Sequence, residues 1–209
     1  MRFIDKTNSR TFGRRAFTLA ELLIVVAIIA VLVGVSIPIF TSQLEKSREA
    51  TDIANMRAAK AAAVQIYYEG INKDNASDYG FTYWESNGSQ EQKSNAWAVY
   101  DGNTGTFITA AKYDQLRKNL IAYGQGTTAD GGTSFNGYGN KLDYTNAVIL
   151  VTIYPDGAGT KGNAAITKYG YPASMGDVPC VILEWRNTTK NNSFIGRGGK
   201  NYGVVVFLE

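Results

Sequence analysis

Hydrophobic residues near the start of the chain form one continuous run and not an alternating or helical pattern. Residues 17–40 read FTLAELLIVVAIIAVLVGVSIPIF, and Glu21 is their only charged residue. At about 1.5 Å per residue, a helix of this length extends about 36 Å, whereas the hydrocarbon core of a bilayer is about 30 Å thick. This run, called the apolar segment below, therefore predicts a helix that can cross a membrane.

Polar residues become frequent after residue 40, and the apolar ones take up a helical spacing. Residues 41–69 contain no glycine or proline, and their apolar side chains recur three, four or seven positions apart. The predicted apolar stripe consists of Ile53, Met56, Ala63, Val64 and Tyr67. The polar residues expected to face away from it are Arg57, Lys60 and Glu69. We expect an amphipathic helix that ends at Gly70 and packs its stripe on a sheet.

The chain beyond residue 70 is rich in Gly, Asn, Ser, Thr and Tyr, and its hydrophobic residues occur in short blocks. Blocks of β-branched and aromatic residues at 147–154, 178–185 and 202–208 predict central, antiparallel strands. The expected fold class is therefore α+β, in which a long N-terminal helix packs on the antiparallel β-sheet of a globular head, residues 70–209.

Two further patterns lie outside these blocks. Residues 107–123 carry apolar side chains at helical spacing and predict a short helix. Residues 124–140 and 156–162 are rich in glycine but lack the phosphate-loop motif, so they predict exposed loops.

The basic residues are concentrated at the N-terminus. The first 16 residues hold five basic side chains and one acid, whereas the whole chain has a formal charge of +3, so the remainder carries −1. A basic arm before an apolar run favours an N-terminus in the cytoplasm. The nearly neutral remainder gives no reason to expect nucleic-acid binding by the head.

Few residues in the chain could carry out catalysis. Histidine is absent, and Cys180 is the only cysteine, flanked by apolar residues. The chain therefore lacks the commonest general base and cannot form a disulfide within itself. The scattered residues Asp130, Asp143 and Asp156 do not form a calcium motif. We expect no enzymatic activity, no metal and no cofactor.

The apolar segment allows several interpretations before its flanks are considered. A cleaved secretory signal also follows basic residues, but its apolar core is usually shorter, about 7 to 15 residues, and no A-x-A site follows this one. A permanent single-pass anchor is another alternative. Glu21 argues for something more specific, because an acid within a membrane costs free energy unless it is neutralised.

The residues around Glu21 are Gly13, Arg14, Arg15 and Ala16, followed by Phe-Thr-Leu-Ala-Glu-Leu-Leu. This arrangement resembles the N-terminal cleavage and methylation signal of type IV prepilins, which has a short basic leader, a small residue at the cut and an acid at fixed spacing inside the apolar helix. The resemblance covers roughly the first 40 residues. Ala16 departs from the family, which usually has glycine at this position.

The resemblance implies a role for individual residues. A prepilin peptidase would cut between Ala16 and Phe17, removing residues 1–16 as a leader, and would methylate the new amine of Phe17. Glu21 would pair with that amine on an adjacent subunit. Cutting after Gly13 would instead leave two arginines on the mature helix.

Gly34 and Pro38 interrupt a sequence that otherwise favours helix, and proline removes a backbone donor and clashes with the preceding turn. A kink is expected. It is either a tolerated membrane-helix kink or, as the resemblance implies, a stretch that loosens during assembly.

By the same resemblance, the chain is a structural pilin subunit that polymerises into a helical filament, a type IV pilus for adhesion or twitching motility. It would lie in the cytoplasmic membrane before assembly and outside the cell afterwards. Its partners would be its own copies, prepilin peptidase, and the assembly ATPase and platform protein of the same machine. The alternatives are a minor pilin or a pseudopilin of a type II secretion or DNA-uptake system, and a membrane-anchored extracellular binding module.

Overall fold

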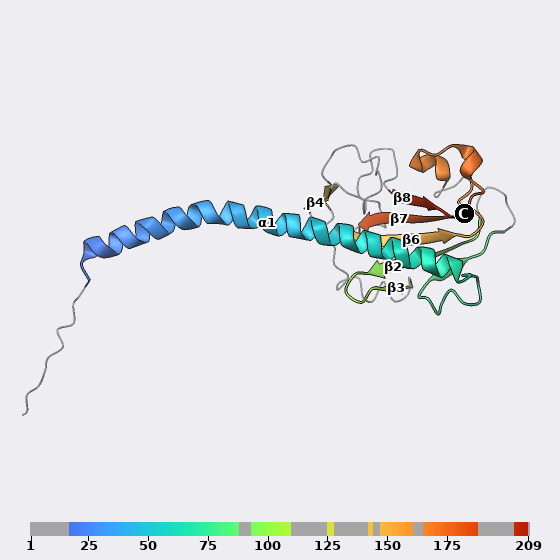
Figure 1. Cartoon of the computed structure of the whole chain (residues 1–209), viewed down its shortest axis with the longest axis horizontal. Helices are drawn as coiled ribbons and strands as arrows, with labels where there is room; N and C mark the ends of the chain where they lie inside the picture. Colours follow the sequence, from blue (N-terminus) through green and yellow to red (C-terminus); the bar gives the residue numbers. More distant parts are fainter. Residues whose placement is uncertain are drawn as a thin grey trace, which may run out of the picture. The chain divides into compact units, whose positions relative to one another are not determined.

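The computed structural model describes residues 17–87, 93–109, 125–127, 142–143, 147–160, 165–187 and 203–208 (Figure 1). The chain divides into two compact units, Met1–Gln43 and Leu44–Glu209. The second is called the folded unit below, and the two are treated separately.

The first element is a single α-helix, α1, Leu19–Tyr68, which is 50 residues long. It includes the apolar segment from Leu19 onward and nearly all of the predicted amphipathic helix. The helix ends where Gly70 adopts a φ of 84°, a conformation that side chains other than glycine rarely take. The amide of Gly70 donates to the carbonyl of Tyr67 at 2.9 Å, which closes the last turn. The helix therefore ends at Tyr68, two residues before Gly70, where its end was expected.

The main sheet of the folded unit has six strands, and all of its strand pairs are antiparallel. The strands are β1 Thr82–Trp84, β2 Asn95–Asp101, β3 Thr106–Ile108, β6 Ala147–Tyr154, β7 Cys180–Asn187 and β8 Gly203–Phe207. Their order is β1-β2-β6-β7-β8, with β3 also paired to β2. The α+β fold with an antiparallel sheet is thereby confirmed.

Four smaller elements accompany this sheet. Strands β4, Gln125–Thr127, and β5, Leu142–Asp143, form a separate two-stranded sheet. Two 3₁₀ helices, η1 Ile166–Tyr169 and η2 Ala173–Met175, lie between β6 and β7 in the chain.

The core of the folded unit lies between α1 and the main sheet, and Figure 1 shows this half of α1 running across the strands. Small residues line the contact, because Ala59 and Ala63 of α1 and Ala96 and Ala98 of β2 are all completely buried. Side chains that alternate along β6 and β7 complete the same core: Ile149, Val151, Ile153, Val181 and Leu183. Alanines on both sides allow the helix backbone to lie close to the sheet.

Most of the predicted helix stripe packs on the core, but the most deeply buried positions of α1 differ from it in part. The fully buried positions of α1 are Asp52, Met56, Ala59, Ala63 and Ile66, four or three residues apart. Of the predicted stripe, Met56 and Ala63 are buried, and Val64 and Tyr67 are partly buried and pack against the core. Ile53 is partly buried. The buried face is centred on alanines because the sheet approaches closely there, and large apolar residues lie at its margins.

The three predicted strands are confirmed as β6, β7 and β8, with β7 beginning two residues later than expected, at Cys180. Only β6 and β7 are central as predicted, because β8 stands at the end of the strand order. The helix predicted at 107–123 was wrong at its start, because Phe107 and Ile108 belong to β3 and pair with Tyr100 and Val99 of β2. Its remainder from residue 110 lies outside the described residues.

The loop predictions need two corrections. Residues 125–127 of the predicted loop 124–140 form strand β4, while the others lie outside the described residues. In the predicted loop 156–162, residues 157–159 are buried and not exposed. The amide of Gly159 donates to the carbonyl of Gly176 at 2.8 Å, and Ala158 packs beside Cys180 and Ile182 in a second apolar cluster.

Candidate functional site

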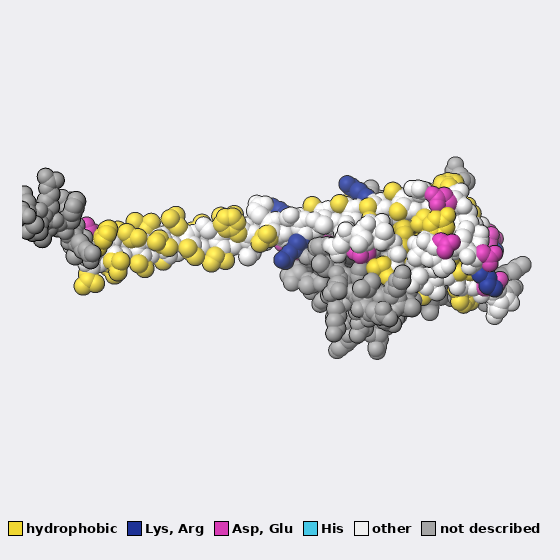
Figure 2. Space-filling model, turned by 90° about the horizontal axis from the view of Figure 1, so that it is seen from below, with side chains coloured by type: hydrophobic (Ala, Val, Ile, Leu, Met, Phe, Trp, Pro, Cys, Tyr) yellow, Lys and Arg dark blue, Asp and Glu magenta, His cyan; other side chains and the backbone are white. Residues whose placement is uncertain are grey.

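The N-terminal unit presents apolar side chains that its own chain does not cover. Large apolar side chains from Phe17 to Phe40 are between 47% and 88% exposed. The helix is long and apolar enough to cross a membrane, with a mean hydropathy of 3.1 over its most apolar window. Figure 2 shows a nearly continuous hydrophobic surface on this helix. Such a surface is unstable in water, so lipid or other protein must cover it.

Glu21 lies in the first turn of α1, where it forms a reciprocal capping arrangement with Thr18. The Glu21 amide donates to Thr18 Oγ1 at 3.2 Å, and the Glu21 carboxylate accepts from the amide and the hydroxyl of Thr18, both at 2.8 Å. This is a capping box, in which the two side chains satisfy donors at the start of a helix. The carboxylate is thereby held at the positive end of the helix dipole.

Thr18 was missed by the sequence reasoning, although a recognisable signal was present. A Ser or Thr followed three residues later by Glu or Gln marks a helix N-terminus. Glu21 is therefore both a charge in an apolar run and a capping residue. Of the predicted cleavage pair, Phe17 is 85% exposed, and Ala16 lies outside the described residues.

Gly34 and Pro38 are four residues apart in α1, and the helix continues through both. Because Pro38 has no amide hydrogen, the carbonyl of Gly34 lacks its usual helical donor. A Cβ atom added at Gly34 would meet nothing within 4 Å, so the folded chain by itself does not require glycine there. The hydroxyl of Thr41 donates to the carbonyl of Pro38 at 3.0 Å. Backbone hydrogen bonding in the apolar segment is therefore weakest at the Gly34–Pro38 turn.

The folded unit contains little that resembles a catalytic or metal site. Among the described residues, no group of three or more Cys, Asp or Glu side chains could hold a metal ion. Cys180 is completely buried, and burial raises the pKa of its thiol to about 12. A thiol with that pKa stays protonated at neutral pH and is a poor nucleophile.

Comparison with known proteins supplies the decisive observation. Residues 12–37 match the family model of the prokaryotic N-terminal methylation motif. A fimbrial protein of Dichelobacter nodosus is 32% identical over 117 residues, which cover 56% of this chain and 71% of that protein. No solved structure matches the chain.

The chain belongs to the type IV prepilin family.

The structure of this prepilin agrees with the family, since a long apolar N-terminal helix continues into a unit with an antiparallel sheet. The family consists of structural fimbrial proteins and not of enzymes. Membership implies oligomerisation into a filament and processing by prepilin peptidase. The matched residues 12–37 include both Phe17 and Glu21.

Proposed function

We propose that this prepilin is the precursor of a structural subunit that polymerises into a type IV pilus, a surface filament for adhesion or motility. The observation that carries the proposal is the apolar surface of α1, which the chain itself leaves exposed from Phe17 to Phe40. In the monomer, lipid covers this surface. In the filament, the same surface packs against other copies, so one segment serves first as anchor and then as filament core.

Processing is proposed between Ala16 and Phe17. Cleavage there removes the basic arm and leaves Phe17 one residue before Thr18, which caps the helix. The new amine, once methylated, remains cationic and lies at the very start of the mature helix. Cleavage after Gly13 would instead place Arg14 and Arg15 on the apolar helix, where two cations are costly in a membrane.

Glu21 is proposed to pair with the Phe17 amine of an adjacent copy. Opposite charges attract far more strongly in a helix bundle of low dielectric than in water, and an unpaired carboxylate there is heavily penalised. The capping box holds the Glu21 carboxylate near the helix start, which prepares it for a cation from outside. A neighbour displaced by four residues, or about 6 Å along the helix, brings its amine to that carboxylate.

The Gly34–Pro38 turn is proposed as the place where the helix loosens when the filament forms or is pulled. Fewer backbone hydrogen bonds must break there than elsewhere in the segment, since Pro38 already leaves the Gly34 carbonyl without its helical donor. Glycine adds conformational freedom to the unwound state. The loosened turn would let subunits lengthen without separating.

The proposed location follows the same order. The basic leader stays in the cytoplasm, α1 crosses the cytoplasmic membrane, and the folded unit lies outside until assembly delivers the subunit to an extracellular pilus. An assembly ATPase and a platform protein of the same machine would drive the transfer of the subunit from the membrane into the pilus. That machine determines whether the filament serves twitching or secretion.

The proposal is tested by intact mass and N-terminal sequencing of protein sheared from the cell surface. We expect filaments made of a chain that begins at N-methylated Phe17. A chain that retains residues 1–16 and stays in the membrane fraction after shearing would instead establish a fixed anchor.

A further inference from the structure

The sequence signature of a helix start occurs twice within α1. Thr18 and Glu21 form it at the observed start of the helix, where both side chains take part in the capping box. The same spacing recurs in the interior of the helix, where Ser42 is followed three residues later by Glu45. A Ser or Thr followed at that distance by Glu marks a helix N-terminus. The second signature therefore lies inside a helix that continues through it.

The second signature follows the weakest stretch of the helix. Ser42 lies about one helical turn after Pro38, whose missing amide leaves the preceding turn short of a donor. The apolar segment ends at Phe40, and the boundary between the two compact units falls between Gln43 and Leu44. A helix that restarts at Ser42 would begin where the sequence changes from apolar to polar.

Hydroxyl groups already donate to backbone carbonyls on both sides of the Gly34–Pro38 turn. The Ser36 hydroxyl donates to the carbonyl of Leu32 at 2.7 Å, and the Thr41 hydroxyl donates to the carbonyl of Pro38 at 3.0 Å. Hydrogen bonds of this kind compete with the amide donors of a helix and often bend it. Carbonyls that lose an amide partner when the turn opens therefore have hydroxyl donors nearby.

Residues 34–41 are not held in a helix by burial. All of them are exposed except Ser36, which is partly buried. Farther along α1, in contrast, Asp52 and Met56 are almost completely buried in the folded unit. Opening the helix between residues 34 and 41 would disrupt no core within the chain, whereas opening it beyond Asp52 would.

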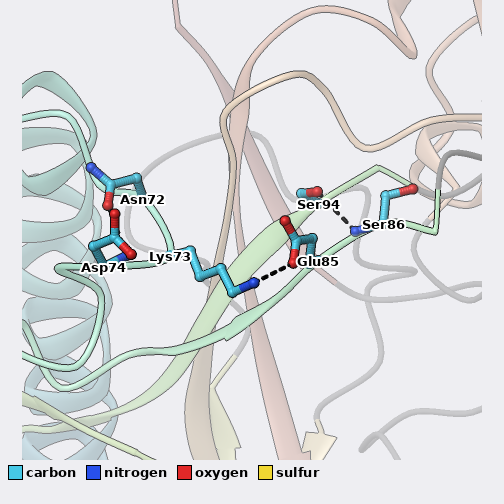
Figure 3. A network of polar contacts seen from close by, with 6 residues as sticks. All are labelled: Asn72, Lys73, Asp74, Glu85, Ser86 and Ser94. Atoms are coloured by element: carbon cyan, nitrogen blue, oxygen red, sulfur yellow. Dashed lines mark hydrogen bonds and ion pairs between the residues drawn. The ribbon is translucent and has the colours of Figure 1, made fainter.

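The other end of α1 is fastened to the folded unit. Ile71 and Ala76, which follow the helix, are buried in its core. Lys73 lies between them in the chain, its ammonium contacts the Glu85 carboxylate at 2.5 Å, and Figure 3 shows this ion pair. An exposed ion pair contributes little by itself, so the buried side chains provide most of the attachment. A pull on the folded unit should therefore open residues 34–41 before it frays this end of the helix.

We propose that α1 of the assembled subunit is interrupted at residues 34–41 and restarts at Ser42, which caps the restarted helix. The inference rests on the proposed loosening of the helix during assembly and defines where the loosened stretch ends. The Ser42 hydroxyl then accepts from the Glu45 amide. The Glu45 carboxylate, which is 3.8 Å from Arg48 in the continuous helix, turns to accept from the Ser42 amide. Two donors that the interruption would leave without carbonyl partners are thereby satisfied.

The interruption has a consequence for the length of the subunit. Residues 34–41 extend about 12 Å as a helix and up to about 27 Å as a fully extended chain. Each subunit can therefore lengthen by up to about 15 Å while its folded unit stays intact.

Electron cryomicroscopy of wild-type filaments sheared from cells tests the proposed interruption directly. We expect helical density to stop near Gly34 and to resume at Ser42. A continuous helix through Pro38 would overturn this inference together with the proposed loosening. A helix that resumes outside residues 41–43 would overturn only the cap at Ser42. An absence of filaments would overturn the proposed polymerisation and this inference with it.

Substitution of Ser42 measures the cap separately. Ser42→Ala removes the capping oxygen and also favours a continuous helix, because alanine is the best helix former. The ratio of open to continuous subunits at a given low force, measured from filament extension in an optical trap, should fall about fivefold. Ser42→Asp supplies another good capping residue and should extend like the wild type.

Thr51→Ala is the matched control for this measurement. Thr51 is an exposed helical residue whose hydroxyl donates to the carbonyl of Ser47, and Ala54 stands three residues after it in place of an acid. Its loss should leave filament extension unchanged. Extension of Ser42→Ala filaments equal to that of wild-type and Thr51→Ala filaments would overturn the cap.

Discussion

The two halves of α1 are continuous in backbone but differ in what covers their apolar side chains. In the N-terminal unit, side chains such as Leu32 are more than half exposed, whereas Met56 and Ala63 in the folded unit are almost completely buried against the sheet. The second half is stabilised by packing within the chain. The first half must obtain equivalent packing from lipid or from other copies, so its residues are adapted to surroundings outside the monomer.

Thr18 and Glu21 add a polar element at the start of the exposed half. A capping box is ordinary at the start of a soluble helix, but here it places a carboxylate at the edge of an apolar run. The same group can therefore serve the helix in the monomer and a neighbouring copy in the filament. The following predictions test this division, beginning with the largest effect.

Loss of the Glu21 charge should abolish filament assembly. Glu21→Gln retains an acceptor for Thr18, because glutamine also completes a capping box, but it removes the charge that the Phe17 amine would pair with. We expect shearing to release no filaments from Glu21→Gln or Glu21→Ala cells, while immunoblots find the chain in the membrane. The exposed acid Glu85 offers a control, since Glu85→Gln should assemble normally. Normal filaments from Glu21→Gln would mean that capping, and not charge pairing, is what assembly requires.

Matched truncations in the two halves of α1 should have opposite consequences. Met56→Ala leaves a cavity in the core and should lower the free energy of unfolding by about 2 to 5 kcal/mol. Leu32→Ala, at a side chain 60% exposed, should leave unfolding of the folded unit unchanged but weaken filaments. Thermal unfolding of the full chain in detergent, followed by near-ultraviolet circular dichroism, measures the first effect, and resistance of filaments to shear measures the second. Equal melting temperatures for the two variants would contradict this distinction.

The buried thiol should make the folded unit sensitive to strongly alkaline pH. Burial raises the pKa of Cys180 from an ordinary 9.0 to about 12, so above pH 9 the unfolded chain releases its thiol proton before the folded chain does. Stability is therefore expected to fall as pH rises from about 9 to about 12. Cys180→Ala should remove this component of the pH dependence when unfolding midpoints are compared at pH 8 and pH 10.5. An identical decline in the variant would assign the effect to other groups.

Gly34→Ala should have the smallest effect on the isolated chain. The new methyl group meets nothing within 4 Å, and alanine favours helix over glycine by about 1 kcal/mol. We expect normal membrane levels and a stiffer filament, with less extension under force in an optical trap. Ala30→Gly serves as the reverse substitution and should make the filament more extensible. Unchanged extension in both variants would exclude loosening at the Gly34–Pro38 turn.

Much of the fold could be predicted because its signals are local. Strand β6 coincides with the predicted block 147–154, since seven of its eight residues are β-branched, aromatic or small and favour a strand regardless of their partners. Strand β2 was not predicted, although it lies between β1 and β6 in the sheet. Its sequence NAWAVYD contains two alanines, which fit a strand only because α1 approaches it closely.

The same reasoning explains the error at residues 107–123. Phe107 and Ile108 carry no local signal that distinguishes a strand from the first turn of a helix. They are extended because the hairpin with β2 supplies hydrogen-bond partners, including the pair Val99 and Ile108. Thr18, in contrast, could have been recognised from its spacing to Glu21 alone.

The sequence by itself determined the apolar segment, its internal acid, the basic leader and the prepilin signal, because each depends on residues close together in the chain. Only the tertiary structure decided which face of α1 is buried and which strands lie side by side. Those features arise where α1 packs on the main sheet, and they depend on backbone separations that no contiguous stretch of sequence records. The composition of a segment thus indicates whether lipid, protein or water surrounds it, whereas tertiary packing determines which residues it contacts.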